Sequence, residues 1–192
     1  KLKLINQIHS NKIFLVDKNN FKNELYGDGL ITTEKNIALG VLTADCAPIF
    51  IYDIQKTIIC CLHSGWKGTL SNISKEGIKI LKNNNIDISS SVAVIGPCLG
   101  FSSYEVNKKF KSKFIKKNKL YEKFFKSKNN IKDLFDLRGL INFQLKMEGL
   151  NKIYNIRKDT YKNADIFFSH RRATHQNKLE TGRMINILSF RD

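Results

Sequence analysis

Residues 38–66, ALGVLTADCAPIFIYDIQKTIICCLHSGW, form the most apolar long stretch of the chain and decide the fold prediction. An apolar strand from residue 38 is interrupted at 43–48 and resumes through 53. A second apolar run, 57–62, follows the turn at 53–56, and two such runs predict a β-hairpin. Both runs are far shorter than the ~18 apolar residues that span a bilayer. The segments TADC (43–46) and HSGW (63–66) therefore stand at the ends of buried strands.

The flanking sequence alternates between strand and helix patterns. Alternating apolar residues predict two short strands around His9, and further strands at 30–33, 91–96, 153–156, 165–169 and 184–190. An apolar stripe at 70, 73, 77, 78 and 81 predicts a helix that starts near Gly68. The amphipathic segment 107–128 and the segment 134–148, with Gly149 as its C′ residue, predict two more helices. Without a repeat or a linker, residues 1–192 are expected to form a single mixed α+β domain.

The composition limits the function classes. The chain has 192 residues and a net charge of +16. Its hydrophobic fraction of 42% is close to that of globular proteins and argues against wholesale disorder. No secretory leader pattern opens the sequence, so we expect a soluble, cytoplasmic protein. Eleven lysines and one acid, Glu122, place +10 of the charge in residues 108–132. Only six of the 33 basic residues are arginine, so this segment is interpreted as a solvated face; a polyanion-binding module stays as an alternative.

The four cysteines are expected to be thiols, because nothing indicates an oxidising compartment. Cys60 and Cys61 lie within one apolar strand, so their side chains are predicted to be buried on opposite faces. Cys98 follows a Gly-Pro turn. None of these three is expected to have a chemical role, whereas Cys46 belongs to the candidate site.

Three short segments, QIH (7–9), TADC (43–46) and HSGW (63–66), carry candidate metal ligands at predicted strand ends. His9 precedes Cys46 by 37 residues, and Cys46 precedes His63 by 17, which matches no local zinc motif. Two imidazoles and one thiolate would nevertheless leave a fourth position open, as catalytic zinc requires. Spacing and placement alone favour the interpretation that these are ordinary strand-end residues over that of a metal site.

Other polar residues near these segments are candidates for catalysis and substrate binding. Asp45 can transfer a proton or cap a turn. Trp66 can stack on a planar substrate or pack in the core. The basic residues can bind an anion or belong to an exposed loop; they are Lys67, Arg171, Arg172 and Arg183.

The segments QIH, ALGVLTADCAPIFIYD, CCLHSGWKGT, IGPCLG, YEV, FDL, FFSHRR and TGRM occur in the order found in the YfiH/YlmD family, which this chain resembles over residues 6–188. Members of that family have been called multicopper polyphenol oxidases or laccase-domain proteins, and later purine nucleoside phosphorylases. The resemblance implies that His9, Cys46 and His63 are the metal ligands. It also implies mixed sheets with helices packed outside, related to a cysteine-hydrolase-like toxin domain.

The activity implied by the resemblance is zinc-dependent phosphorolysis of adenosine, inosine and methylthioadenosine, with adenosine deamination as a further activity. Asp45, Cys46 and His63 would then be catalytic, and Trp66, Lys67, Arg171, Arg172 and Arg183 would bind substrate. The resemblance also implies that about fifty N-terminal residues usual in the family are missing here. His170 stands where the family usually has tyrosine.

Three rival functions remain at this point. A laccase-like phenol oxidase reduces O₂ with several coppers held mainly by imidazoles, whereas this chain has four histidines in all. Cu²⁺ would still compete with Zn²⁺ for the site by the Irving–Williams order. A metal-free hydrolase would use Cys46 and His63 as a dyad. The third is the polyanion-binding module. We expect a purine nucleoside and phosphate as ligands, neither a membrane nor a nucleic acid as partner, and a second copy of the chain as a candidate partner.

Overall fold

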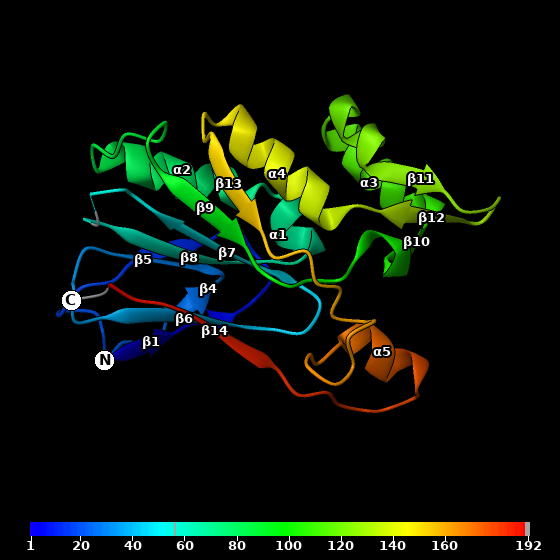
Figure 1. Cartoon of the computed structure of the whole chain (residues 1–192), viewed down its shortest axis with the longest axis horizontal. Coiled ribbons are helices and arrows are strands. Elements are labelled where there is room, and N and C mark those ends of the chain that lie inside the picture. Colours follow the sequence, from blue (N-terminus) through cyan, green and yellow to red (C-terminus); the bar gives the residue numbers. More distant parts are fainter. Residues whose placement is uncertain (56, 191–192) are drawn as a thin grey trace.

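The computed structural model describes residues 1–55 and 57–190, and its core has three layers (Figure 1). The middle layer is a six-stranded mixed sheet. Its strands, in spatial order, are β13 (Lys152–Asn155), β9 (Val92–Ile95), β7 (Ala47–Tyr52), β8 (Ile59–Ser64), β5 (Gly29–Thr32) and β3 (Ile13–Leu15). Helices α1 (Trp66–Leu70), α2 (Ile73–Asn83) and α4 (Leu137–Met147) cover one face. A three-stranded sheet of β1 (Leu2–Leu4), β6 (Ala38–Thr43) and β14 (Met184–Leu188) covers the other.

The predicted hairpin is confirmed and forms the centre of the sheet. β7 and β8 pair antiparallel, from Ala47 opposite Ser64 to Tyr52 opposite Ile59. Residue 56, which belongs to the predicted turn, lies outside the described residues. β8 is buried along its whole length because strands flank it and layers cover both its faces. This explains why its sequence is a continuous apolar run and not an alternating one.

Two hydrophobic cores lie on opposite sides of β8. Cys60 packs into the core beneath the helices, whereas Cys61 packs into the core between the two sheets. The predicted alternation of these side chains is therefore confirmed, and all four cysteines are free thiols. Leu62 and Leu30, both fully buried, represent the two cores. Burying a side chain of this size contributes about 1.5–3 kcal/mol to stability.

The helix predicted near Gly68 is two helices. α1 ends at Leu70, and Asn72 adopts the left-handed conformation (φ 57°) between the two helices. The Asn72 side chain accepts a hydrogen bond from the Lys75 amide and so caps α2. Residues 73, 77, 78 and 81 of the predicted apolar stripe lie on the buried face of α2, whereas Leu70 ends α1.

The helix predicted over 107–128 is wrong in its extent. The segment forms α3 (Lys108–Lys117), a 3₁₀ stretch η2 (Lys119–Phe124) and β11 (Phe125–Ser127). β11 and β10 (Glu105–Asn107) pair on either side of β12 (Lys132–Phe135), which makes a small lobe beside the main sheet. Asn118 ends α3 because its extended backbone leaves the helix and its side chain caps Leu120.

The third predicted helix starts later than residue 134, because residues 132–135 pair as a strand and Asp136 caps α4 through the Gly139 amide. It ends as predicted, with Gly149 at φ 96°.

The predicted strand at 165–169 is also wrong: these residues form turns and lead to Ser169, the N-cap of α5 (His170–His175). The remaining elements are short: β2 (Asn6–Gln7), β4 (Tyr26–Gly27) and the 3₁₀ turn η1 (Phe101–Ser103). The architecture as a whole is the mixed α+β domain that the sequence predicted. Within the described residues, every helix is too short or too polar to cross a membrane.

Candidate metal centre

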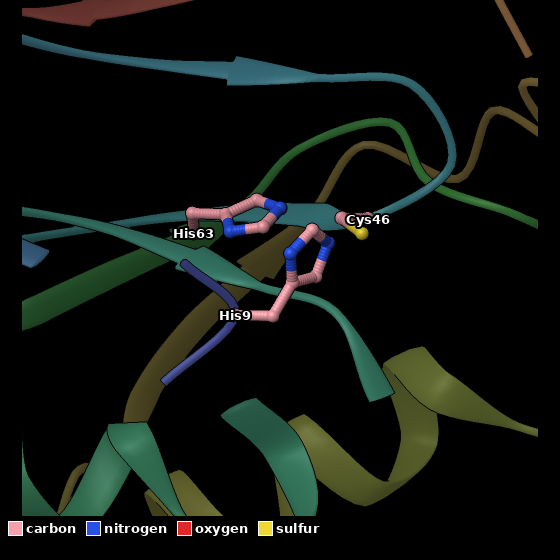
Figure 2. A group of neighbouring side chains, drawn as sticks. All are labelled: His9, Cys46 and His63. Atoms are coloured by element: carbon pink, nitrogen blue, oxygen red, sulfur yellow. The ribbon is translucent and has the colours of Figure 1, made fainter. Parts of the chain in front are cut away.

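Three segments distant in the sequence bring His9, Cys46 and His63 together at one end of the central hairpin (Figure 2). His63 lies near the end of β8, Cys46 directly precedes β7, and His9 lies in the loop after β2. One ligand atom from each residue lies within 4.8 Å of the other two. The two imidazole rings meet edge to face, with centroids 4.9 Å apart. The structure therefore forms a group that can hold a metal ion, as the family resemblance implied.

Asp28, a fully buried acid, holds two of these three residues in place. Its Oδ1 accepts hydrogen bonds from the His63 ring at Nδ1 (2.8 Å) and from the His9 amide (2.9 Å). Its Oδ2 accepts from the Ser10 amide (2.5 Å) and hydroxyl (2.8 Å). Burial opposes ionisation of Asp28, but the hydrogen bonds from His63 and Ser10 outweigh it and keep its pKa below the ordinary value. A carboxylate at Nδ1 fixes the tautomer of His63 that offers Nε2 as a ligand.

Asp28 was not among the predicted site residues, because the segment YGDG (26–29) that contains it has the glycine pattern of a turn. The sequence does place Asp28 directly before an apolar run, and the structure buries Gly27, Asp28 and Gly29 at the start of β5. Such an acid must be paired, and the pairing here is with candidate ligands.

Backbone space at the centre suits a metal ion, which would have to displace the proton of the Cys46 thiol. A Cβ on Gly65 would lie 2.7 Å from the Cys46 Sγ and 3.3 Å from the His9 ring, so only glycine leaves room for these side chains. Desolvation, followed by the Asp45 charge, raises the pKa of the Cys46 thiol to about 12. Desolvation and the neighbouring His63 lower the pKa of His9. Two imidazoles and one thiolate form a donor set typical of zinc or copper.

Asp45 lies beside the centre in a left-handed backbone conformation (φ 83°). Both its carboxylate oxygens carry short hydrogen bonds: Oδ1 accepts from the Thr160 hydroxyl (2.6 Å) and Oδ2 from the Arg171 amide (2.6 Å). Arg171 is in the first turn of α5. Asp45, the neighbour of Cys46, thus holds the C-terminal segment against the centre. Its role in proton transfer stays a prediction.

A cavity of about 330 Å³ opens on one side of the centre. Trp66, Lys67 and Arg171 line it together with His9, Asp45 and Cys46. The Trp66 ring packs on Phe110 (5.3 Å between centroids) and Trp66 also lines the cavity, while its stacking on a substrate stays a prediction.

Tyr104, which was not among the predicted site residues, also lines this cavity. Burial raises the pKa of Tyr104, so its hydroxyl keeps its proton. The Arg171 guanidinium lies 5.4 Å from this ring and donates to the Glu105 carbonyl (3.0 Å). One cavity wall therefore carries a cation that its own contacts orient.

A second cavity, of about 440 Å³, lies on the other side of the centre and shares His9, Cys46 and His170 with the first. Arg183 lines this second cavity. Arg172 lines neither of the two: its guanidinium donates to the carbonyls of Thr160 (2.7 Å), Tyr161 (2.8 Å) and Phe167 (2.5 Å). Of the three predicted C-terminal arginines, the structure brings two to the centre, and the third fixes the loop.

Comparison with known proteins identifies the family of this chain. Residues 1–191 match the model of a family described as multi-copper polyphenol oxidoreductase laccase. Among curated proteins, purine nucleoside phosphorylase RP494 of Rickettsia prowazekii is 36% identical over 176 residues, which cover 90% of this chain and 71% of that protein. Purine nucleoside phosphorylase RC0672 of Rickettsia conorii is 35% identical and covers 97% and 75% of the two chains.

Solved structures have the same fold. The crystal structure of the hypothetical protein YfiH of Bacillus licheniformis superposes with a TM-score of 0.89 at 25% identity, covering 99% of this chain and 74% of that one. The Neisseria meningitidis protein NMB0706 superposes with a TM-score of 0.88 at 26% identity, covering 98% and 75%. Since the family model covers the chain almost completely and relatives exceed 30% identity, the chain belongs to the laccase-like polyphenol oxidoreductase family that includes YfiH-type folds.

Proposed function

We propose that this chain is a zinc-dependent purine nucleoside phosphorylase, with His9, Cys46 and His63 as the zinc ligands. The observation that carries the proposal is an incomplete donor set of three residues beside a cavity lined by Lys67, Arg171 and aromatic rings. The names of relatives 31–36% identical to this chain support the same reaction class. The substrates would be inosine, adenosine and methylthioadenosine, with phosphate.

In this reaction a phosphate oxygen forms a bond to C1′ of the sugar as the bond from C1′ to the purine nitrogen breaks. The purine leaves with the bonding electron pair and takes up a proton, which gives free base and ribose 1-phosphate, or methylthioribose 1-phosphate from methylthioadenosine. A zinc ion, when bound, supplies Lewis acidity that stabilises negative charge developing on the substrate. The protein residues must hold the phosphate, orient the purine and exclude water.

Lys67 and Arg171 are the proposed phosphate-binding residues of the first cavity. Arg171 is suited to this role because its guanidinium is held against Tyr104 and the Glu105 carbonyl while the cavity stays open beside it. A fixed guanidinium can bind two phosphate oxygens and stays charged at any working pH. The rings of Trp66 and Tyr104 offer apolar area for a purine ring.

Arg183 and His170 extend the proposal to the second cavity. His170 lines both cavities, so it lies where a nucleoside and a second small molecule would meet. Arg183 supplies the cation of the second cavity. Adenosine deamination, the further proposed activity, replaces the C6 amine with water and consumes no phosphate. If Arg183 binds phosphate, the variant Arg183→Ala is expected to affect phosphorolysis more than deamination.

Phenol oxidation at copper is the second candidate, because the family model carries that name. A two-histidine, one-cysteine donor set occurs in copper electron-transfer sites, which add a long axial methionine. The chain has two methionines: Met147 is exposed, and the Met184 sulfur accepts a hydrogen bond from the Phe168 amide. With only four histidines in the sequence, an assembly of several coppers has few imidazoles to draw on. The donor set thus favours zinc.

Elemental analysis of protein purified without added metal, combined with product analysis, tests the proposal. We expect about one zinc per chain, and hypoxanthine from inosine only when phosphate is present. Chelation should abolish the reaction and added zinc should restore it. Activity that persists after complete metal removal would instead support a hydrolase with a Cys46–His63 dyad. Phenol oxidation that requires copper, without phosphorolysis, would support the family-model name.

A further inference from the structure

A third cavity, of about 430 Å³, lies outside the metal centre. Leu99 lines both this cavity and the first one, so the two lie on either side of that residue. The cavity is formed by the loop after β9, the loop after β13 and helix α4, which lies alongside β13 (Figure 1). β9 and β13 are parallel, and both point their carboxyl ends toward these loops. Crevices at the carboxyl ends of parallel strands are common ligand sites in α/β folds.

Three cations from two segments line the cavity: Arg138 and Lys146 on α4, and Arg157 after β13. Asp136 is the only acid among the lining residues, and its Oδ1 accepts the Gly139 amide as the cap of α4. The cavity therefore carries an excess of positive charge. Lysine is abundant everywhere in this chain, but arginine occurs only six times in 192 residues. Two arginines at one cavity are not explained by the lysine-rich composition.

The walls of this cavity are held in place by their own hydrogen bonds. Arg138 donates from Nη2 to the Lys158 carbonyl (3.0 Å) and to the Cys98 sulfur (3.2 Å), which orients the guanidinium plane. Asn142 and Asn155 exchange two amide hydrogen bonds (2.8 and 3.1 Å) and lock α4 against β13. The spacing of Arg138, Asn142 and Lys146 places them on one face of α4.

We propose that this cavity binds the phosphoryl group of a small phosphorylated metabolite between Arg138 and Arg157. Arginine is the side chain best suited to two phosphate oxygens, and an oriented guanidinium loses less conformational entropy on binding. Phe101, which is 38% exposed at the cavity, offers an apolar surface for the sugar or base of such a ligand. The site is separate from the proposed phosphorylase site because none of the three candidate metal ligands lines it.

Amide NMR titrations of the full chain test this site, because glycine amides report on each cavity separately. Gly100 and Gly139 line the third cavity, whereas Gly65 lines the first. The probes are inorganic phosphate, ribose 5-phosphate and AMP. We expect saturable shifts at Gly100 and Gly139 with at least one of them. Tighter binding of the esters would indicate a phosphate ester as ligand, and equal binding would indicate free phosphate; either result supports the site.

Arg157→Gln is the main variant, because Arg157 is exposed and its loss should not disturb the fold. It should weaken the affinity reported by Gly100 and Gly139 by roughly 10-fold or more. Lys158→Gln is the matched control: it removes the same charge at the next position, and Lys158 does not line the cavity. Phosphorolysis should stay unchanged in both variants.

Three outcomes would overturn the proposal. The first is a set of shifts confined to Gly65, which would place all phosphate binding at the metal centre. The second is an equal loss of affinity in Arg157→Gln and Lys158→Gln, which would reduce the effect to net charge. The third is binding of single-stranded oligonucleotides without binding of any small phosphate, which would indicate a polyanion surface. Because the readout is a binding shift at residues that do not line the first cavity, failure of the proposed phosphorylase reaction would not affect it.

Discussion

The metal centre and the lysine-rich lobe (residues 101–135) use charge in opposite ways. At the metal centre, two buried acids fix the candidate ligands and their surroundings: Asp28 binds His63 and the His9 loop, and Asp45 binds α5. In the lobe, most charges are exposed: Lys111 pairs with Glu122 near the surface (3.1 Å), and only the pair of Lys108 with Asp133 (2.6 Å) involves a buried acid among the described residues. The comparison teaches that a few buried, hydrogen-bonded polar groups identify this site better than the density of charge does.

The lobe nevertheless contributes to the centre through its apolar side. Phe110, Phe114, Phe125 and Phe135 pack under the lysines, with stacked rings at 4.7 Å between Phe125 and Phe135. Phe110 extends this cluster to Trp66, which lines the first cavity. The lysines thus lie outside an aromatic cluster that packs against one wall of the first cavity.

Removing a ligand should give the largest effect. Cys46→Ala is expected to reduce zinc from about one ion per chain to background, because two imidazoles alone bind weakly. Activity should fall by more than the roughly 10–100-fold typical of outer-shell changes. Elemental analysis and initial rates measure both quantities.

Cys98→Ser is the control for this change. Cys98 is buried and contacts Arg138, so some stability should be lost while zinc content and specific activity stay near wild type. Wild-type zinc content in Cys46→Ala, or a large loss of activity in folded, zinc-loaded Cys98→Ser, would contradict the assignment.

Asp28→Asn should have the second largest effect. The carboxamide cannot accept all the hydrogen bonds that the carboxylate accepts from His63, His9 and Ser10. We expect zinc affinity to fall by roughly 10–100-fold, measured by competition with a chelator.

Asp53→Asn provides a matched control for Asp28→Asn at the opposite end of the hairpin. Asp53 is also buried and also accepts backbone amides, from Thr57 and Ile58, but it lies far from the ligands. It should lose stability without losing zinc affinity. An equal loss of zinc affinity in both variants would show that Asp28 acts through general stability only.

Local signals predicted the central hairpin, whereas the ligand trio was selected by the resemblance to a known family. Buried strands produce apolar runs, and the ligands follow or end those runs. The hydrogen-bond partners of these residues were not predictable: Asp28 binds His63 across 35 positions, and Asp45 binds Thr160 across 115. Such pairings follow from sheet order and loop course, which no short pattern encodes.

The predicted helix boundaries were wrong for a related reason. Residues 107–128 have helical periodicity throughout, yet Asn118 caps a new turn and β11 pairs with β12. Strand pairing supplies hydrogen bonds that periodicity cannot anticipate, so tertiary context overrides local pattern. The same applies to Arg172, whose place among loop carbonyls could not be distinguished from that of Arg171 by sequence.

The third prediction contrasts arginines that line the cavities with Arg172, which lines neither of the two at the metal centre. Arg171→Gln should raise the KM for phosphate by roughly 10-fold or more while zinc content stays constant, because a charged hydrogen-bond donor is lost from the first cavity. Arg183→Ala should raise the same KM from the second cavity. Kinetics at varied phosphate concentration, with deamination of adenosine as the phosphate-independent reference, measure these effects.

Arg172→Gln is the matched variant for this contrast. Three loop carbonyls lose their donor, so we expect a loss of about 1–3 kcal/mol in unfolding free energy with an unchanged KM. A raised KM in Arg172→Gln alone would move the phosphate site to that residue.

The smallest effect is expected in the lysine-rich lobe itself. Lys109, Lys116, Lys117 and Lys119 are exposed and have no ion-pair partner among the described residues. Replacing all four with glutamine lowers the net charge by four but should change the unfolding free energy by no more than about 0.5 kcal/mol per site. Phosphorolysis should stay within about twofold of wild type, since surface charges beyond a Debye length are screened.

Lys113→Gln sharpens this comparison, because the Lys113 ammonium lies 5.4 Å from the Trp66 ring. A cation–π contact made by an exposed lysine contributes about 0.5–1 kcal/mol. This single change should therefore shift the nucleoside KM more than the variant with four lysines replaced does. Oligonucleotide binding measured at low and moderate salt tests the alternative role of the lobe. If the fourfold variant lost a tight, sequence-tolerant binding of nucleic acid while Cys46→Ala retained it, the lobe would have a function of its own, and charge density would identify a site after all.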